Sequence, residues 1–412
     1  MRICDLGAKS GTFCGDIIQR AIDEQAAKGG GRVAIPAGEY LTGSLVLRSN
    51  IELHLEAGAL LRFTDDFDRY PIIEARWEGY EQPVHRALVY AKGEKNVSIT
   101  GLGTMEGQGA KWWAAFRAKE LTAARPYFVS FEDCERVLLR GFRVQNSPAW
   151  TLHPLRCENV SIRGVTVVNP PDSPNTDGID PESCRHVRIT DCHIDVGDDC
   201  IAIKAGTEDA KHPVPCENVT VTGCTMVHGH GGVVLGSEMS GGIRRVSISS
   251  CVFDGTDRGI RIKSRRGRGG VVEDVSVTGI VMHDVICPIV INMRYSCGKD
   301  GQSEYVSSQE PQPVCAGTPY VRRVRLGNIV ATNVRSAAGC LYGLPEAPLE
   351  DISISNTQIH LVEDTPSLPV MDMIQKPVTL AGLTANHVHG LRLNDLRIFG
   401  AKGGERTFSD VE

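Results

Sequence analysis

The stretch ENVSIRGVTVVN, residues 158–169, contains the pattern that decides the fold. Val160 and Ile162 alternate with polar residues, Gly164 provides a bend, and a second alternating run follows. Alternation with a period of two residues is the pattern of a half-buried β-strand. The stretch therefore predicts two short strands joined by a tight bend.

The same phrase recurs on both sides of this stretch. Its first apolar position falls at Val137, Val160, Val187, Val219, Val246 and Val275, at intervals of 23, 27, 32, 27 and 29 residues. Periods of this size are typical of solenoids. A unit this long, with several bends, can return to its starting point and add a parallel strand to the previous unit. We therefore predict an all-β fold, a parallel β-helix of roughly ten coils, with an antiparallel β-sandwich as the alternative.

The ends of such a stack need covers, because the first coil otherwise exposes its strand edges. Residues 15–28 place Ile17, Ile18, Ala21 and Ile22 at helical spacing, and this predicts an N-terminal capping helix. Residues 299–320 contain several prolines and interrupt the repeat, which predicts a protruding loop. The repeat covers most of the 412 residues, which predicts a single domain over 1–412.

Composition limits the classes of function. A net charge of −6 disfavours a nucleic-acid partner, and no run of 18 apolar residues predicts a membrane span. With no signal-peptide pattern at residue 1, we expect a cytoplasmic protein; a signal sequence that had been removed would make it secreted or periplasmic instead. The 14 cysteines lack metal or disulfide spacing and predict mostly reduced core thiols. The sequence does not specify an oligomeric state.

Acidic residues gather in NTDGIDPESCRHVRITDCHIDVGDDC, residues 175–200. Asp177 is followed about one coil later by the pair Asp198 and Asp199. Further steps of about one coil lead to His230, to Arg261 and Lys263, and to Tyr295. Equivalent positions on successive coils lie about 4.8 Å apart, so these side chains can form one ladder. In the strand around Ile262, alternation sends Ile262 inward and the two flanking cations outward, where an anionic ligand could meet them.

Such a cluster suits hydrolysis of an acidic glycan. One carboxyl group must stay protonated to donate to the leaving oxygen, and others must stay ionised to activate water. Seen alone, an Asp-Asp pair in a turn is more often a solvated turn or a calcium ligand, and a single histidine is usually structural. The joint order and coil-scale spacing favour the catalytic interpretation. Which of Asp198 and Asp199 is the acid cannot be assigned from the residues alone.

Four motifs stand in this order along the chain: NTDGID from Asn175, GDDCIAIK from Gly197, GHGG from Gly229 and RIK from Arg261. With these motifs the chain resembles glycoside hydrolase family 28, the polygalacturonase family. The resemblance implies a right-handed parallel β-helix and hydrolysis with inversion, without metal or cofactor. Inversion in turn predicts roughly 6.5–9.5 Å between the acid and base carboxyl groups.

The resemblance also implies a role for each matching residue. Asp198 is similar to the general acid, Asp177 and Asp199 to the pair that positions water, and His230 to the residue that supports the acid. Arg261 and Lys263 would bind a galacturonate carboxylate, Tyr295 would contact the sugar, and Asn175 would shape the site.

The resemblance implies a pectic substrate, with α-1,4-galacturonosyl linkages of homogalacturonan or oligogalacturonides fitting best because both RIK and Tyr295 are present. RYPIIEARWEGYE, residues 69–81, resembles a segment of bacterial exo-acting members, so we expect exo attack. The alternatives are a hydrolase of rhamnogalacturonan or xylogalacturonan, a calcium-dependent pectate lyase, and a non-catalytic glycan-binding solenoid.

Overall fold

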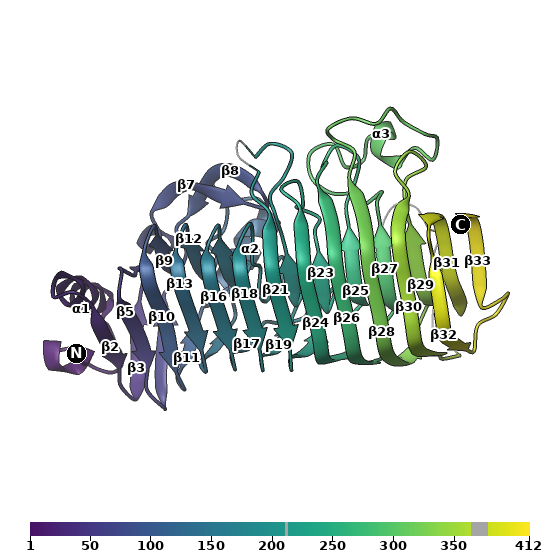
Figure 1. Ribbon diagram of the computed structural model, residues 1–412. Helices are drawn as coiled ribbons and strands as arrows, with labels where there is room; N and C mark the ends of the chain where they lie inside the picture. The colour runs from purple at the N-terminus through teal and green to yellow at the C-terminus, as the bar shows by residue number, and fades with distance from the viewer. Residues whose placement is uncertain (211–212, 364–377) are drawn as a thin grey trace. The chain divides into compact units, whose positions relative to one another are not determined.

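The computed structural model describes residues 1–210, 213–363 and 378–412, and most of them lie in parallel strands. The chain forms two compact units, Met1–Asp198 and Asp199–Glu412, and each is described by itself. Each unit is a stack of parallel β-helix coils (Figure 1). The all-β parallel β-helix prediction is therefore confirmed, and the β-sandwich alternative is wrong. The single domain over 1–412 stays a prediction.

The first unit contains three parallel sheets. The first sheet stacks β2 (Gly31–Ile35), β5 (Ile51–Leu55), β10 (Lys95–Gly101), β13 (Glu135–Arg140), β16 (Glu158–Arg163) and β18 (Arg185–Thr190). The second stacks β1 (Thr12–Phe13), β3 (Gly38–Thr42), β6 (Ala59–Phe63), β11 (Thr104–Glu106), β14 (Arg143–Gln145), β17 (Thr166–Val168) and β19 (His193–Val196). The third stacks β4 (Leu45–Val46), β9 (Val89–Lys92), β12 (Val129–Glu132) and β15 (Leu152–Leu155).

The aligned valines of the repeat set the register of the first sheet. Val137 pairs with Val160, and Val160 pairs with Val187. All three side chains are buried, while the residues on either side of them along each strand are not. Because side chains alternate between faces, this register places every aligned valine in the core. The aligned valines of the repeat are therefore paired positions of neighbouring strands.

A left-handed residue precedes the aligned valine in each of these strands. Asn159 has φ 60° and His186 has φ 59°, and the ladder skips both residues, pairing Glu158 with Arg185 and then Val160 with Val187. Because each strand skips one residue at the same place, the register is kept across the bend. Asparagine tolerates this conformation better than most residues, which explains its frequent appearance in the repeat.

Helices and a hairpin complete the first unit. Helix α1 (Gly15–Ala27) buries Ile18, Ala21 and Ile22 and lies at the N-terminal end of the stack beside β2, as predicted for a capping helix (Figure 1). An antiparallel hairpin is formed by β7 (Ile72–Trp77) and β8 (Tyr80–His85). The remaining elements are η1 (Ile3–Leu6), η2 (Phe67–Arg69) and α2 (Ala110–Ala118).

The second unit repeats the arrangement with longer strands. Its first sheet stacks β21 (Cys216–Thr222), β24 (Ile243–Asp254), β26 (Val271–His283), β28 (Tyr320–Val334), β30 (Leu349–Leu361) and β32 (Arg392–Phe399), with β22 (Thr225–His228) pairing to β24. Its second stacks β20 (Ile201–Ile203), β23 (Val233–Leu235), β25 (Arg258–Lys263), β27 (Cys287–Asn292), β29 (Ala337–Tyr342), β31 (Ala381–His389) and β33 (Arg406–Val411). Val219, Val246 and Val275 again pair in register.

The segment between β27 and β28 contains the short helix α3 (Glu304–Ser307) and includes the predicted protruding loop. With six strands in each unit's first sheet, the described residues form slightly more coils than the roughly ten predicted. Most cysteines are buried free thiols, as predicted. No helix in the described part of the chain is long and apolar enough to cross a membrane.

Candidate active site

Two of the predicted acids lie in the first unit. Asp177 is buried, and its backbone carbonyl accepts a hydrogen bond from Thr151 N at 2.8 Å, which extends the third sheet beyond β15. Asp198 follows β19, two residues after its last residue, and is half-buried. Because β17 pairs with β19, the segments that follow these strands belong to neighbouring coils. Carboxylate oxygens of Asp177 and Asp198 lie within 4.8 Å of each other.

This separation is shorter than the roughly 6.5–9.5 Å expected between the acid and base of an inverting pair, so that prediction is wrong for Asp177 and Asp198. The reason is geometric: the two carboxylates come from adjacent coils, and adjacent strands lie about 4.8 Å apart. The spacing still leaves room for a bridging water, because two hydrogen bonds of about 2.8 Å each can span about 5.5 Å.

Asn175 begins the NTDGID motif and has a left-handed backbone, with φ 53°. Its side-chain Oδ1 accepts a hydrogen bond of 2.6 Å from Arg125 Nη2. Arg125 Nη1 also donates to the carbonyl oxygens of Pro148 and Pro174. Arg125 thereby joins the turn that carries Asn175 to the segment before β15, which fixes the approach of the chain to Asp177.

The other predicted charged residues lie in the second unit, around Asp199. Lys263 Nζ donates to Asp199 Oδ2 at 2.7 Å, and Arg261 Nη1 lies 3.6 Å from Oδ1. Burial alone would raise the pKa of Asp199, but the two cations offset it and hold that pKa well below its usual range. Asp199 is therefore an ionised carboxylate, with a hydrogen bond from Lys263 at Oδ2 and the Arg261 guanidinium close to Oδ1.

Strand alternation in β25 is as predicted, but the exposure of its cations is not. Ile262 is fully buried in the core, and Arg261 and Lys263 point to the opposite face. Both cations are nevertheless buried, at 5% and 7% exposure, because they pair with Asp199. Tyr295, which is half-buried, places its ring 5.2 Å from each of them. The aromatic face adds a cation–π contact to the ion pairs.

His230 is exposed and lies in the turn between β22 and β23. The next residue, Gly231, accepts a hydrogen bond of 2.8 Å at its carbonyl from Cys200 N, which brings this turn beside Asp199. A Cβ atom on Gly231 would lie 2.4 Å from Val234 Cγ2 and 3.2 Å from Asp199 Oδ1. The glycine that follows His230 in GHGG thus permits the close approach of this turn to the carboxylate.

Several charged and aromatic residues of the two units were not predicted from the sequence. Lys204 and Glu238 form a buried ion pair of 3.2 Å in the second unit; Lys204 ends the GDDCIAIK motif, which could have signalled it. In the first unit, Trp77 stacks on Tyr127 with ring centroids 5.1 Å apart. Trp77 lies in the segment 69–81 that resembles exo-acting members, whereas Arg125 has no motif around it that could have drawn attention.

Comparisons with known proteins agree with these motifs. The family model for Glycosyl hydrolases family 28 matches residues 28–310. A probable polygalacturonase of Vitis vinifera is 34% identical over 357 residues, covering 84% of this chain and 70% of the relative. An endo-polygalacturonase of Pectobacterium carotovorum subsp. carotovorum is 29% identical, covering 68% of this chain and 71% of the relative.

Among solved structures, the hyperthermoactive exopolygalacturonase of Thermotoga maritima superimposes with a TM-score of 0.79 at 31% identity. The match covers 98% of this chain and 92% of the Thermotoga chain. Family model, sequence relatives and solved structure thus lead to one conclusion: this chain belongs to glycoside hydrolase family 28 and is an inverting enzyme that hydrolyses galacturonan linkages.

Proposed function

We propose that the enzyme attacks the ends of homogalacturonan fragments, releasing terminal galacturonate by exo action. The β7–β8 hairpin of the first unit supports this proposal, because it packs on coil segments on both sides of Asp177 in the sequence, through Trp150 and Glu182, and would close one side of the substrate groove there. A groove that is closed on one side accepts the end of a sugar chain but not its middle. The similar Thermotoga maritima protein is an exopolygalacturonase, whereas the Pectobacterium relative is named as an endo enzyme.

The hairpin is held by contacts along both of its strands. Trp77 stacks on Tyr127, which in turn stacks on Trp150 at 5.1 Å. Arg76 Nη1 donates to Glu182 Oε1 at 3.0 Å, in a buried ion pair. On β8, His85 N donates to the carbonyl of Ala124 at 2.9 Å. Aromatic stacking, a buried charge pair and backbone hydrogen bonds together make the hairpin rigid.

Removing the hairpin tests this proposal directly. Ile72 and His85 are paired across the hairpin, so residues 73–84 can be replaced by the two-residue turn Asn-Gly. The parent should release monomer from homogalacturonan at the first time point, with little loss of viscosity. The shortened variant should produce intermediate lengths, and viscosity should fall faster per reducing end formed.

Two further variants guard against a general loss of structure. Trp77→Ala keeps the chain length but removes the stacking on Tyr127, and should increase the fraction of longer products. Glu74→Gln changes an exposed side chain on the same hairpin, away from the Arg76 ion pairs, and should leave the product profile unchanged. Intermediate lengths from the unmodified enzyme at early times would show that exo action is wrong.

The catalytic roles form the second part of the proposal. We infer that Asp198 donates a proton to the leaving oxygen, while Asp177 and Asp199 position the attacking water. The ionised state of Asp199 suits a carboxylate that accepts a hydrogen bond from the attacking water, since Lys263 and Arg261 keep it charged. His230 would support the acid, Arg261, Lys263 and Tyr295 would contact a galacturonate unit, and Asn175 would shape the site.

Gly231→Ala should lower both activity and stability. The added Cβ meets Val234 and the Asp199 carboxylate, so one of them must move. Overpacking of this kind costs roughly 1–3 kcal/mol, which urea unfolding measures, and a displaced carboxylate lowers kcat. Gly327→Ala is the matched control, because its Cβ approaches the rotatable Ser355 hydroxyl at 2.9 Å. Equal kcat in Gly231→Ala and the parent would contradict the role of Asp199.

A further inference from the structure

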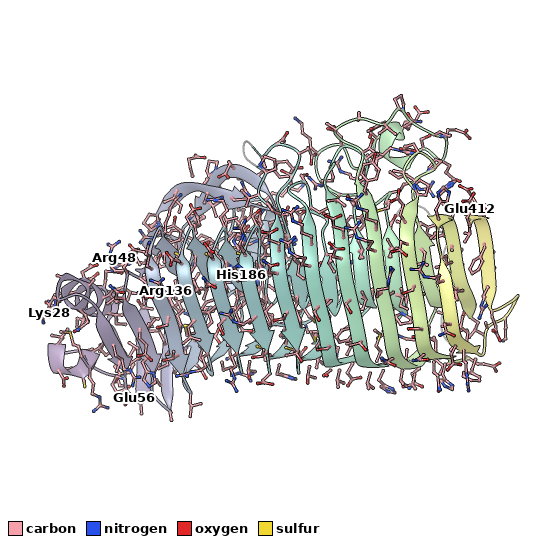
Figure 2. The ribbon with its side chains drawn as sticks, viewed as in Figure 1. Lys28, Arg48, Glu56, Arg136, His186 and Glu412 are labelled. Carbon is pink, nitrogen blue, oxygen red and sulfur yellow. The ribbon has the colours of Figure 1, made fainter. Side chains whose placement is uncertain are left out.

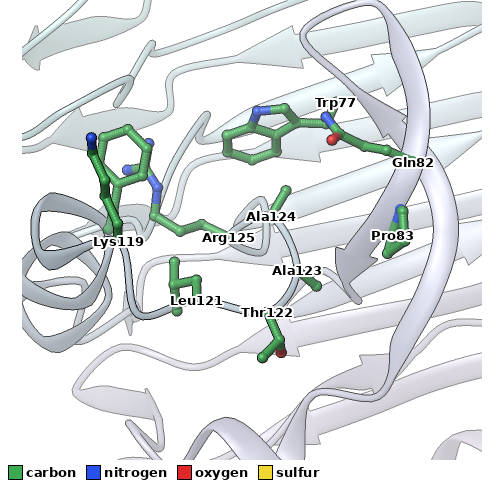
Figure 3. A pocket seen from close by; sticks show the side chains of 10 residues that line it. Trp77, Gln82, Pro83, Lys119, Leu121, Thr122, Ala123, Ala124 and Arg125 are labelled. Carbon is green, nitrogen blue, oxygen red and sulfur yellow. The ribbon is translucent and has the colours of Figure 1, made fainter.

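A pocket of about 430 Å³ lies between the hairpin and the segment that follows α2 in the first unit. Figure 3 shows Trp77, Gln82 and Pro83 of the hairpin on one side, and Lys119 and Arg125 with the residues between them on the other. The volume is within the range of small-molecule sites, which is roughly 300–1,000 Å³. No role for this pocket follows from the four family motifs, since none of them contributes a lining residue.

The lining of this pocket is positively charged. Lys119 and Arg125 are its two charged residues, and neither Asp nor Glu occurs among the described lining residues. Lys119 is exposed, whereas Arg125 is only 1% exposed. Two cations without a carboxylate on the same wall create a site that favours an anion.

Arg125 is a buried cation that forms no ion pair with any carboxylate in the described ranges of the chain. Its hydrogen bonds reach two backbone carbonyls and the Asn175 amide oxygen, all uncharged acceptors, and its Nε finds no acceptor among the described residues. Burial accordingly lowers the pKa of Arg125 to about 10, so the group is still charged at neutral pH. Glu78 and Asp177 favour the charged form of Arg125 without forming an ion pair with it, so an anion in the pocket would add a direct charged partner.

Aromatic rings complete the pocket. The Arg125 guanidinium lies 4.0 Å from the centroid of the Phe116 ring and 5.5 Å from that of Trp77. Phe116 also lines the pocket and is 44% exposed. A flat apolar surface next to cations matches a sugar acid, whose ring has apolar C–H faces and whose substituent is a carboxylate.

Arg125 links this pocket to the predicted catalytic segment, because its Nη2 donates to Asn175, two residues before Asp177. We propose that the pocket of Trp77, Phe116, Lys119 and Arg125 is a second carboxylate-recognition site, which binds the terminal galacturonate unit of the substrate. This inference rests on the proposed exo action, and it assigns the end unit a charged partner other than Arg261 and Lys263. Lys119 contacts the carboxylate, Phe116 contacts the sugar face, and Arg125 supplies the buried charge.

The test uses the full-length Asp198→Asn variant, so that oligosaccharides bind without being cleaved. Trigalacturonate binding is measured by calorimetry with and without Lys119→Gln. We expect the Kd to rise about threefold at low salt, as for one exposed charge contact, and the difference to shrink at high salt. The matched control is Lys28→Gln, the same charge loss at an exposed residue at the end of α1 (Figure 2), which should leave the Kd unchanged.

Phe116→Leu is the second variant, and it should raise the Kd by roughly threefold at all salt concentrations, because it removes a ring face but no charge. Methyl-esterified trigalacturonate is the second ligand, and Lys119→Gln should not change its Kd. Parent-like affinity for trigalacturonate in both Lys119→Gln and Phe116→Leu would overturn the assignment. The exo proposal is judged separately, by product length. Weaker trigalacturonate binding in the two variants, together with endo products from the parent, would support the pocket as a binding site and contradict exo action.

Discussion

Asp198→Asn is expected to lower kcat on oligogalacturonides by about 10³-fold. A positioned general acid typically contributes 10²–10⁴-fold, and an amide cannot donate the proton that the leaving oxygen needs. Asparagine and aspartate have nearly the same shape, so the half-buried position should accept the change without a loss of stability. Initial rates of reducing-end formation measure kcat, and calorimetry with trigalacturonate measures binding, which should stay within about threefold of the parent.

Asp191→Asn is the matched control for this change. Asp191 lies in the preceding turn, its side chain is 61% exposed, and it lies 3.6 Å from the equally exposed Arg163. Its φ of 56° suits asparagine as well as aspartate. The control should retain parent activity. A parent-like rate in Asp198→Asn would show that another group protonates the leaving oxygen, and a large loss of binding would show that Asp198 holds the substrate.

Lys263→Met should have the largest effect on stability. It removes the cation that donates to Asp199 Oδ2 at 2.7 Å, in a position that is 7% exposed. Leaving one partner of a buried ion pair uncompensated costs about 3–5 kcal/mol. Arg261, at 3.6 Å, still offsets part of the charge, so we expect a loss of about 3 kcal/mol at pH 7 in urea unfolding. The value of kcat/KM should fall as well, because Asp199 loses its fixed position.

The effect of Lys263→Met should depend on pH. In the parent, the pKa of Asp199 is depressed, so its ion pairs stabilise the fold above the unfolded pKa of about 3.9, and this stabilisation is lost only as pH falls through the lower folded value. Without Lys263 the folded pKa rises. Protonation then neutralises the uncompensated carboxylate at a higher pH, and the gap between variant and parent should shrink on acidification.

An exposed ion pair provides the control for this prediction. Lys402 lies 3.7 Å from Glu363, with side chains 67% and 73% exposed, so Lys402→Met should change the free energy of unfolding by less than about 1 kcal/mol. The same unfolding midpoint for Lys263→Met and the parent would mean that the pair with Asp199 contributes little to the fold. A loss that does not change with pH would mean that packing, rather than charge, is responsible.

Much of the fold could be predicted because the sequence repeats one local pattern. The aligned valines of the repeat became paired residues, as Val160 and Val187 show, since a strand's register follows from its buried face. The site motifs were also readable, because catalysis needs particular groups at particular steps of the coil. Four points stay predictions: which of Asp198 and Asp199 is the acid, the cellular location, the metal-free scheme and the absence of a nucleic-acid partner.

Other features depend on contacts that no local pattern encodes. The position of Arg125 depends on hydrogen bonds to backbone carbonyls of distant turns. The burial of Lys263 depends on its ion pair with Asp199. The acid–base distance was predicted wrongly because adjacent coils, about 4.8 Å apart, hold Asp177 and Asp198 closer together than the general range for inverting enzymes. The distance between two carboxylates on adjacent coils of a β-helix is limited by the spacing of the strands that carry them.

The paired valines of the repeat stand 23 residues apart in one coil and 29 in another, yet their pairing is preserved. Extra residues are therefore accommodated in the turns, where they do not disturb the hydrogen-bonded frame. Evolution can lengthen or exchange such a turn in a single step, and the reacting groups keep their positions. In a scaffold of this kind, substrate preference can change through the turns while the catalytic residues stay in place. Exchanging hairpins between relatives is therefore a practical route to altered pectin-degrading enzymes.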